Sequence, residues 1–355
     1  MAAGRSRLIL HVTECYGGGV QSMVRRYAAV APDARHILLW NARRTQHPGD
    51  PVRDGVYDDV LALPEGHAAA VREVRSVARG LDPDVIHAHS SFGGAYARLA
   101  CGADRRLRSR VAYTPHGLAV DDAGRTLPKR LVFLAAEVAL SLAGGTFAGC
   151  SLREDRLLGR INPFVPRHPL PNGLVGEEIP DMEWSPAQPP EVGIAARITA
   201  VRRPEMFADV VRRVRAERPD VRFTWIGDGP EELRTVLEDA DVEVTGWAAK
   251  GEVLHRMANF SVYLHSASQD GFPVSVLEAF SVGVPVLVPG IAAFEDAPAA
   301  VRYSDVGEAA AKVVAALDDP GAVLSAWEPI RRRHAPEAFA TAVRTLYGLP
   351  TEAAA

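Results

Sequence analysis

The sequence of 355 residues is poor in cysteine and contains no long apolar run. Its three cysteines, Cys15, Cys101 and Cys150, are widely spaced and odd in number, which argues against a disulfide framework or a cysteine-ligated zinc site. The most apolar candidate helix, Leu131–Ala143, is too short to span a bilayer and contains Glu137. No segment resembles a secretory signal. We therefore expect a cytoplasmic protein in a reducing compartment.

No strong excess of either charge occurs over the whole chain, but the two halves differ. Residues 1–180 contain 23 Lys and Arg against 18 Asp and Glu, whereas residues 181–355 contain 17 against 26. No basic run exceeds Arg331–Arg333, and we expect no nucleic-acid partner. The basic excess of the first half fits solvated arginines, or a face that meets an anionic acceptor or an anionic membrane surface.

Short runs rich in Val and Ile alternate with helical patterns of about 10–15 residues, which predicts α/β domains with parallel sheets. The length favours two such domains. In the first half we expect strands at Leu8–Val12, His36–Trp40, Val85–His89, Val111–Thr114 and Thr146–Cys150. In the second half we expect strands at Val192–Ala196, Arg222–Ile226, Val242–Thr245, Val262–His265 and Val284–Val288.

A proline-rich segment separates the two halves. Residues 180–190 contain four prolines and no periodic pattern, which predicts a linker. We expect an N-terminal Rossmann-like domain over residues 1–179 and a C-terminal Rossmann-like domain over residues 191–334. Residues 335–355 predict a terminal helix, which could cross back to the N-terminal domain, and a tail.

Glycines follow the first predicted strand. Gly17, Gly18 and Gly19 would let backbone amides approach a ligand at a helix N-terminus. A dinucleotide fingerprint would need glycine in place of Ser22 and an acidic residue near Asn41, after the second strand. The pattern therefore argues against an NAD-dependent oxidoreductase, and a tight turn without a ligand is the alternative.

Histidines end or follow two further strands of the first half. His87 and His89 share one face of a strand and could bind a metal, but the sequence offers no third ligand nearby. They could equally be hydrogen-bonded histidines beneath a cleft. His116 lies between Pro115 and Gly117 in a strand-end loop, where contact with substrate and a packing role are both open.

Asp82 and Asp84 superficially form a D-x-D metal-ligand pair. They precede the strand Val85–His89, whereas ligands of an open parallel sheet bind beyond the carboxyl ends of its strands. We therefore expect a turn at these residues.

The second half places charged side chains after its strands. Arg197 and Arg202 lie in a strand-to-helix loop and could both reach a diphosphate. Asp270 lies in a later loop, and Glu278 lies in the helix expected at Val274–Val282. Two carboxylates beside free helix-start amides can accept sugar hydroxyls while the amides bind phosphate. Solvated surface charges are the alternative.

Together these segments resemble retaining glycosyltransferases of family 4, which have the GT-B fold. Asp270 and Glu278, within SASQDGFPVSVLEAFSVG, resemble the family's E-x7-E signature, and Arg197 with Arg202 resembles its R-x4-K pair. Five further segments follow the family's order: Gly17–Val20, His87–Ser91, Thr114–Gly117, Leu170–Gly173 and Ile226–Pro230. The resemblance covers nearly the whole chain. Asp270 in place of Glu and Arg202 in place of Lys are departures that could alter donor choice.

The resemblance implies a hexosyltransferase like those of bacterial cell-surface polysaccharide or natural-product synthesis, acting with retention from a nucleoside-diphosphate sugar onto an acceptor hydroxyl. The implied catalytic residues are His116, Arg197, Arg202 and Asp270. The implied donor-binding residues are Gly18, Gly19, Arg197, Arg202, Gly227, Thr245, Gly246, Trp247, Asp270, Gly271, Phe272, Pro273, Val274 and Glu278. The acceptor-side candidates are Gly17, Ser90, Ser91 and Asn172.

In this implied site the two arginines neutralise the diphosphate, Glu278 binds the ribose, and Asp270 and His116 bind the transferred sugar. No metal and no other cofactor are expected. The acceptor would be a small molecule, a glycan or a lipid-linked molecule, and the N-terminal domain could touch the inner face of the membrane. The alternatives are a silent nucleotide-sugar-binding or assembly subunit, and an epimerase or a phosphorylase on the same fold.

Overall fold

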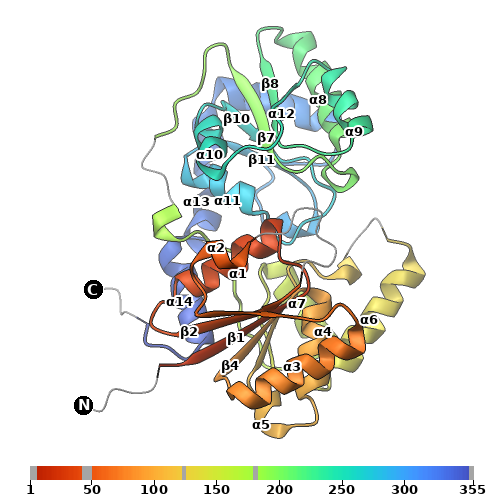
Figure 1. The fold of residues 1–355 in the computed structure, drawn as a ribbon. Coiled ribbons are helices and arrows are strands. Elements are labelled where there is room, and N and C mark those ends of the chain that lie inside the picture. The colour runs from red at the N-terminus through yellow and green to blue at the C-terminus, as the bar shows by residue number, and fades with distance from the viewer. Residues whose placement is uncertain (1–5, 42–49, 122–124, 179–182, 352–355) are drawn as a thin grey trace. The chain divides into compact units, whose positions relative to one another are not determined.

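The structure, a computed structural model, describes residues 6–41, 50–121, 125–178 and 183–351 (Figure 1). The chain forms two compact units: Met1–Val175 with Ala335–Ala355, and Gly176–His334. Within the described residues, no helix is both long enough and apolar enough to cross a membrane.

The first unit contains a six-stranded sheet and the helices that pack on it. Its strands are β1 (Leu8–Thr13), β2 (Arg35–Trp40), β3 (Asp59–Ala62), β4 (Val85–His89), β5 (Val111–Thr114) and β6 (Thr146–Phe147). Its α-helices are α1 (Gly18–Ala29), α2 (Pro51–Asp54), α3 (His67–Leu81), α4 (Ser90–Cys101), α5 (Arg105–Arg108), α6 (Leu127–Ser141), α7 (Leu152–Ile161) and α14 (Pro336–Leu346).

The second unit repeats this plan with another six-stranded sheet. Its strands are β7 (Glu191–Ala195), β8 (Arg222–Ile226), β9 (Glu243–Val244), β10 (Val262–Leu264), β11 (Val286–Pro289) and β12 (Arg302–Tyr303). Its α-helices are α8 (Pro204–Glu217), α9 (Glu231–Glu238), α10 (Lys250–Ala258), α11 (Val274–Ser281), α12 (Val306–Asp318) and α13 (Pro320–Arg333).

Both sheets have the same strand order. The first is β3-β2-β1-β4-β5-β6, and the second, read from its other edge, is β9-β8-β7-β10-β11-β12. All strand pairs are parallel. This is the order of Rossmann-like domains, and it reverses between the first and fourth strands of each unit. The expected two-domain α/β fold is therefore confirmed, and the carboxyl ends of β1 with β4 and of β7 with β10 are where ligands are expected.

The first sheet is covered on both faces, and alternate residues of each strand supply the two layers. Ile37 and Leu39 of β2 belong to the core cluster that includes Val74 of α3 and Ala97 of α4. Leu38, between them, belongs to the cluster on the α1 side of the sheet. The period of two seen in the sequence thus becomes two apolar layers.

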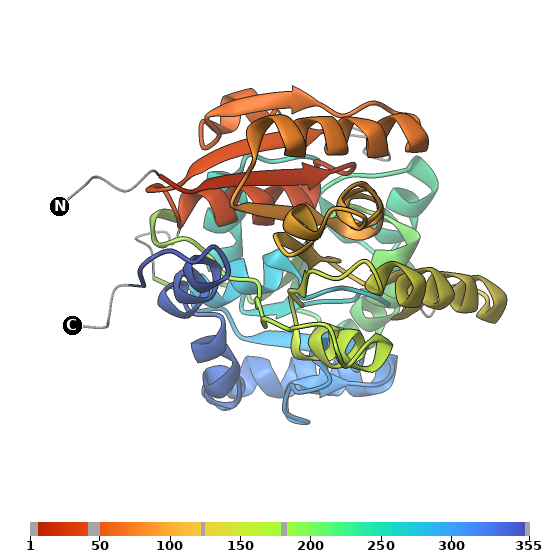
Figure 2. The same cartoon turned by 90° about the horizontal axis from the view of Figure 1, so that it is seen from below.

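Two segments at the predicted domain boundaries are packed. Residues 183–190, the described part of the expected linker, belong to the second unit, where Trp184 Nε1 donates to the Phe260 carbonyl over 2.7 Å. Helix α14 belongs to the first unit, and its Phe339 is fully buried. Arg344 of α14 makes two contacts to the Asp33 carboxylate, at 2.7 and 2.9 Å. Figure 2 shows α14, in dark blue, near the red N-terminal strands of the same unit.

Candidate active site

The two arginines and the acidic loop of the second unit lie at its strand-order reversal. The Arg197 loop follows β7, the Asp270 loop follows β10, and these strands are neighbours. The Arg202 guanidinium contacts the Asp270 carboxylate directly. Ser266 Oγ donates to the Arg202 carbonyl over 2.6 Å, which ties the two loops together. Residues far apart in the sequence thus meet at the place where an open parallel sheet binds its ligand.

The Asp270 side chain is only 14% exposed, and its carboxylate is charged. Burial alone would raise its pKa, yet Arg202 and then His265 outweigh this effect and hold the pKa well below its usual range. His265 Nε2 lies 3.5 Å from Asp270 Oδ2, and burial lowers the pKa of His265. Asp270 and Arg202, expected on the sugar and on the diphosphate, therefore contact each other in this structure. A bound diphosphate would compete with Asp270 for the guanidinium.

Arg197 is exposed on a loop that contacts the glycine turn after β8. The Ile198 N–H donates to the Asp228 carbonyl over 2.8 Å. Gly227 has a φ of 143°, and a Cβ there would lie 2.1 Å from the Ala196 carbonyl oxygen. Glycine is therefore required at residue 227 for the turn to approach the loop. Gly227, expected to bind donor, supports the Arg197 loop.

The predicted donor helix exists as α11, and its first residues differ in exposure. Gly271, Val274 and Glu278 are partly exposed. Phe272 is buried and stacks on His334 with ring centroids 4.0 Å apart, and Pro273 is buried as well. Phe272 and Pro273 could therefore serve a donor through the position of their backbone rather than through exposed side chains.

The loop after β9 presents an aromatic side chain. Gly246 has a φ of 74°, a conformation that favours glycine, and Thr245 Oγ1 donates to its carbonyl over 2.9 Å. Gly246 also pairs with Gly227, so this loop lies beside the turn after β8. Trp247 is 55% exposed. An exposed ring at a strand end can stack on a nucleobase.

The glycine loop of the first unit opens α1. Gly17 is the N-cap residue and offers no side chain to cap the helix, so the first amides of α1 have no side-chain partner at the cap. Gly18 has a φ of 57°, which explains a glycine there. A Cβ at Gly19 would meet no described atom within 4 Å. Packing therefore does not require glycine at residue 19, and the exposed amides favour approach by a ligand.

The acceptor-side candidates occupy different environments. Ser90, with a φ of 62°, donates from Oγ to Glu14 Oε2 over 2.6 Å. Ser91 is partly exposed at the start of α4, whereas Asn172 is only 4% exposed and its N–H donates to the Cys150 carbonyl. Ser90 and Ser91 are both partly exposed and are thus more accessible than Asn172. Glu14, which sequence reasoning missed, orders the start of α4.

His116 lies at the carboxyl end of β5 in a strained conformation with a φ of 55°. Glu154 holds the turn, because its Oε1 accepts from the Gly117 N–H and its Oε2 from the Cys150 N–H, both over 2.8 Å. Burial lowers the pKa of His116 to about 3, so the ring is neutral at physiological pH. Ser151 Oγ accepts from the Glu154 N–H as an N-cap of α7, and the Glu154 carboxylate is thereby placed beneath the His116 loop.

The expectation that His87 and His89 have no third ligand nearby was wrong. His11 of β1 lies in register with His87, and the ligand nitrogens of His11, His87 and His89 lie within 4.8 Å of one another. These nitrogens already have partners. His87 bonds to Tyr347 and Thr114, each over 2.9 Å, and His11 bonds to His89 over 3.1 Å. The cluster is therefore satisfied by hydrogen bonds within the protein, which argues against a metal centre.

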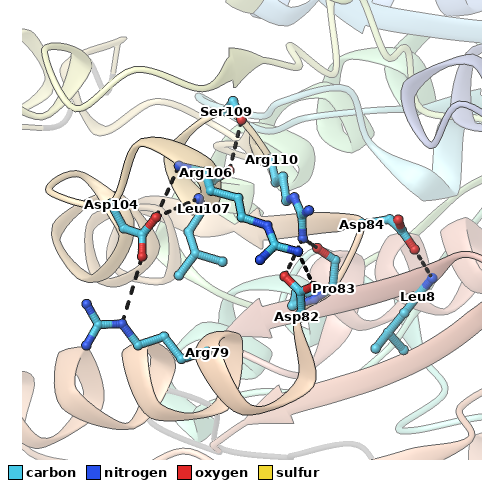
Figure 3. Close-up of polar contacts among 10 residues, drawn as sticks. All are labelled: Leu8, Arg79, Asp82, Pro83, Asp84, Asp104, Arg106, Leu107, Ser109 and Arg110. Atoms are coloured by element: carbon cyan, nitrogen blue, oxygen red, sulfur yellow. Dashed lines mark hydrogen bonds and ion pairs between the residues drawn. The ribbon is translucent and has the colours of Figure 1, made fainter.

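Asp82 and Asp84 form a turn at the amino end of β4, as expected (Figure 3). Asp82 pairs with Arg106 and, over 2.8 Å, with Arg110. Asp84 accepts from the Leu8 N–H over 2.9 Å. Both carboxylates thus stabilise the amino ends of the strands, whereas ligands of such a sheet bind beyond the carboxyl ends.

Solved structures share this two-unit architecture. Sucrose-phosphate synthase from Thermosynechococcus elongatus is similar with a TM-score of 0.75 and 16% identity, covering 97% of this chain and 98% of that one. The Anabaena protein HepE, in complex with UDP-glucose, is similar with a TM-score of 0.74 and 16% identity, covering 96% of this chain and 100% of that one. At this identity the likeness concerns the fold.

Sequence comparisons agree with the fold. A GDP-mannose-dependent alpha-mannosyltransferase of Mycolicibacterium smegmatis is 27% identical over 274 residues, which are 71% of this chain and 70% of that protein. The family model described as "Glycosyl transferase 4-like domain" matches residues 18–173, and the model described as "Glycosyl transferases group 1" matches residues 189–319. Each match lies within one structural unit. The chain is a glycosyltransferase and belongs to the family 4-like glycosyltransferases with the GT-B fold.

Proposed function

We propose that this glycosyltransferase transfers a hexose-type sugar from a nucleoside-diphosphate sugar to an acceptor hydroxyl, with retention at the anomeric carbon. The observation that carries the proposal is the convergence of Arg197, Arg202, Asp270 and Glu278 on the loops and helix that follow β7 and β10. Cations suit the diphosphate and carboxylates suit sugar hydroxyls. The mannosyltransferase relative is GDP-mannose-dependent and HepE was solved with UDP-glucose, which supports this class of donor.

The proposed chemistry needs no separate cofactor. The acceptor oxygen forms a bond to the anomeric carbon while the bond from that carbon to the phosphate oxygen breaks. The electron pair of the broken bond stays on the diphosphate, where Arg197, Arg202 and the α11 amides stabilise it. The proton of the acceptor hydroxyl passes to the leaving phosphate oxygen on the same face of the sugar. Asp270 and His116 bind the transferred sugar in this proposal.

A donor panel tests the proposal. The purified chain would be incubated with the UDP, GDP and dTDP forms of glucose, galactose, mannose and N-acetylglucosamine, with simple glycosides as acceptors. We expect release of one nucleoside diphosphate, and a product whose anomeric coupling constant in NMR matches that of the donor. An inverted product would overturn retention. Tight nucleotide-sugar binding without any transfer or hydrolysis would support a silent binding subunit instead.

The acceptor is proposed to lie at an anionic membrane surface, and helix α6 carries this part of the proposal. Four of its large apolar side chains and that of its C-cap residue are exposed: Leu127, Leu131, Val132, Val138 and, at the C-cap, Leu142. Val132 is 69% and Leu142 76% exposed. Figure 2 shows α6, in olive yellow, projecting from the first unit. An apolar helix face of this kind can lie in the interfacial layer of a bilayer.

The charges around α6 fit anionic lipid. Its acidic residue, Glu137, is buried in an ion pair with Arg98 at 2.9 Å and so adds no negative charge to the surface. Lys129 and Arg130 lie on the helix. Phe164, after α7, is 93% exposed, and the nearby Asn162 donates to Ser141 of α6 over 2.9 Å. Exposed apolar groups with neighbouring basic residues would favour a membrane that contains anionic lipids.

A further inference from the structure

Four histidines of the first unit form an unbroken chain of hydrogen bonds. His11 lies in the middle, with its Nε2 3.0 Å from His36 Nδ1 and its Nδ1 3.1 Å from His89 Nε2. His89 Nδ1 in turn lies 3.2 Å from His116 Nε2. At the other end, His36 Nε2 lies 2.9 Å from the Ala31 carbonyl oxygen. This chain of hydrogen bonds thus connects the Ala31 carbonyl to the loop that contains His116.

The alternation of the strands builds this chain. Leu10 and Val12 of β1 face the α3 and α4 side, which leaves His11 on the α1 side. On that side the His11 ring stacks between its neighbours, with centroids 5.3 Å from His36 and 5.4 Å from His89. Tyr27 of α1 covers His89, with centroids 5.6 Å apart. His36, His11 and His89 therefore lie inside the protein, between the sheet and its helices.

The four rings are neutral. Burial lowers the pKa of His11 and His89 well below its usual value, and it also lowers the pKa of His36. The pKa of His116 falls to about 3 for the same reason. A neutral imidazole has one N–H donor and one lone-pair acceptor, so each ring in the chain can donate once and accept once.

The backbone carbonyl then sets the direction of every bond. The Ala31 oxygen can only accept, so His36 carries its proton on Nε2 and accepts at Nδ1. His11 must therefore donate from Nε2 and accept at Nδ1. The same argument makes His89 donate from Nε2 and accept at Nδ1. His116 must donate from Nε2, and its Nδ1 is left with a lone pair.

His116 Nδ1 is the free end of the chain. Among the described residues, none hydrogen-bonds to this nitrogen, and the side chain is partly exposed at the ligand-binding edge of the sheet. We propose that His36, His11 and His89 are positioning residues that lock His116 in the Nε2–H tautomer, so that Nδ1 accepts a hydrogen bond from a hydroxyl of the transferred sugar. The identity of that hydroxyl rests on the proposed function, whereas the tautomer does not.

A proton wire fits the same contacts less well. The Ala31 carbonyl oxygen is not a group that releases or stores a proton, so protons entering at His116 would have no exit at that end. A locked chain of hydrogen bonds needs no exit, because it acts by orientation alone, as the hydrogen-bond partner of one histidine nitrogen fixes the role of the other in many sites.

The first experiment reads the tautomer without any substrate. The full chain would be labelled with ¹⁵N-histidine, and two-bond ¹H–¹⁵N correlation at pH 7 would show which nitrogen carries the proton. A His116→Gln variant would assign the His116 signals. We expect protonated Nε2 and bare Nδ1 at His116. A proton on Nδ1 of His116 in the parent protein would overturn the proposal, whatever the donor panel shows.

The second experiment compares His11→Phe with His87→Phe as a matched control. Both residues are fully buried, and both ring nitrogens of each are hydrogen-bonded. The His87 ring centroid is 4.1 Å from that of His89, but His87 does not belong to the chain of four hydrogen-bonded histidines. We expect His11→Phe alone to populate the Nδ1–H form of His116 and to lower turnover by about tenfold, with unchanged nucleoside-diphosphate affinity. Equal losses of turnover in both variants, at equal melting temperatures, would mean a purely structural role. If His11→Phe does not fold, the parent spectrum decides.

Discussion

Arg197 and Arg202 were grouped by their spacing in the sequence, but the structure gives them different surroundings. Arg197 is exposed, whereas Arg202 is paired with the half-buried Asp270. Within the described residues the Arg197 side chain makes no ion pair, so a diphosphate can bind it without breaking one. For Arg202 it must first weaken an existing ion pair. Removing each arginine should therefore have similar effects on donor affinity but different effects on the stability of the protein.

We predict that Arg197→Ala and Arg202→Ala each lower nucleoside-diphosphate affinity about tenfold or more, because each removes a charge-assisted contact of about 1.5–3 kcal/mol. Calorimetric titration with the diphosphate measures this. The melting temperature should stay unchanged in Arg197→Ala and fall in Arg202→Ala, which leaves Asp270 buried without its cation. Unchanged affinity in both variants would remove the arginines from the donor site.

The pH dependence of stability follows from the lowered pKa of Asp270. A carboxylate whose pKa is lower in the folded state contributes stability above its unfolded pKa of about 3.9. This contribution is lost as the pH falls toward the pKa of the folded state. In Arg202→Met, burial raises the pKa of Asp270, so this variant should regain stability as the pH falls. Urea unfolding of both proteins between pH 7 and pH 3 should show their difference shrinking. The difference at pH 7 should stay below the about 3–5 kcal/mol of fully buried pairs, since the Arg202 side chain is 28% exposed. A constant gap would contradict the assignment.

The sequence singled out Arg202 and Asp270 because each was expected in a loop after a strand, and the structure places them there. It missed residues whose partners are distant in sequence. Glu14 bonds to Ser90, 76 positions away, and His11 bonds to His89, 78 positions away. Nothing local marks such residues, because a buried acid or imidazole acquires its role only when β1 and β4 pair.

At the scale of elements, central strands were predicted closely and edge strands less well, since β6 and β9 were expected at Thr146–Cys150 and Val242–Thr245 and are shorter in the structure. The bounds of β4, β5 and β8 agree with the sequence prediction, because both faces of a central parallel strand are buried and most of its residues are apolar. Strands β3 and β12 were missed. They lie at sheet edges, and β12 has only two residues, Arg302 and Tyr303, so no apolar run marks it.

Helix α6 gives a prediction for one element. The double variant Leu131→Glu with Val132→Glu places charge on the exposed apolar face without touching the buried Glu137 side. We expect sedimentation with vesicles of 30% phosphatidylglycerol in phosphatidylcholine to fall at least severalfold, because the apolar contact is lost and the added charges are repelled. Transfer to a soluble acceptor should be unchanged.

The control for α6 is Val52→Glu, since Val52 is an apolar residue of α2 that is 74% exposed. This variant should keep parental vesicle binding. Pure phosphatidylcholine vesicles should bind every form weakly, and added salt should weaken binding to the anionic ones. Parental binding by the α6 double variant would show that this helix does not meet the membrane.

Over the whole molecule, the two units share one strand order but differ in what they place at its reversal. The second unit places cations and carboxylates beside each other, after β7 and β10. The first unit places a glycine loop after β1. It places Ser90, bonded to Glu14, after β4, and His116, the end of the chain of hydrogen-bonded histidines, after β5. The fold could be predicted from sequence periodicity, whereas this division of chemistry depended on contacts between strands.

Metal independence is the prediction that concerns the molecule as a whole. A departing diphosphate must have its negative charge stabilised, either by a divalent cation on carboxylates or by fixed cations and amides. Within the described residues, Asp82 and Asp84 are committed to structural contacts, and Asp270 is paired with Arg202. The nitrogens of the histidine cluster bond to protein groups. Arg197 and Arg202 supply positive charge where the diphosphate is proposed to bind.

We therefore expect sugar transfer to survive excess EDTA with at most a modest loss of rate, in protein whose metal content has been measured before and after dialysis. The same assay with added magnesium or manganese should change the rate little. A matched measurement on Arg197→Ala sharpens the test, because loss of a fixed cation should slow transfer in EDTA and in buffer alike. Complete inactivation of the parent by EDTA, reversed by either metal, would mean that a bound cation and not the arginines carries the charge of the leaving group. It would also reopen carboxylates such as Asp270 and Glu278 as its ligands.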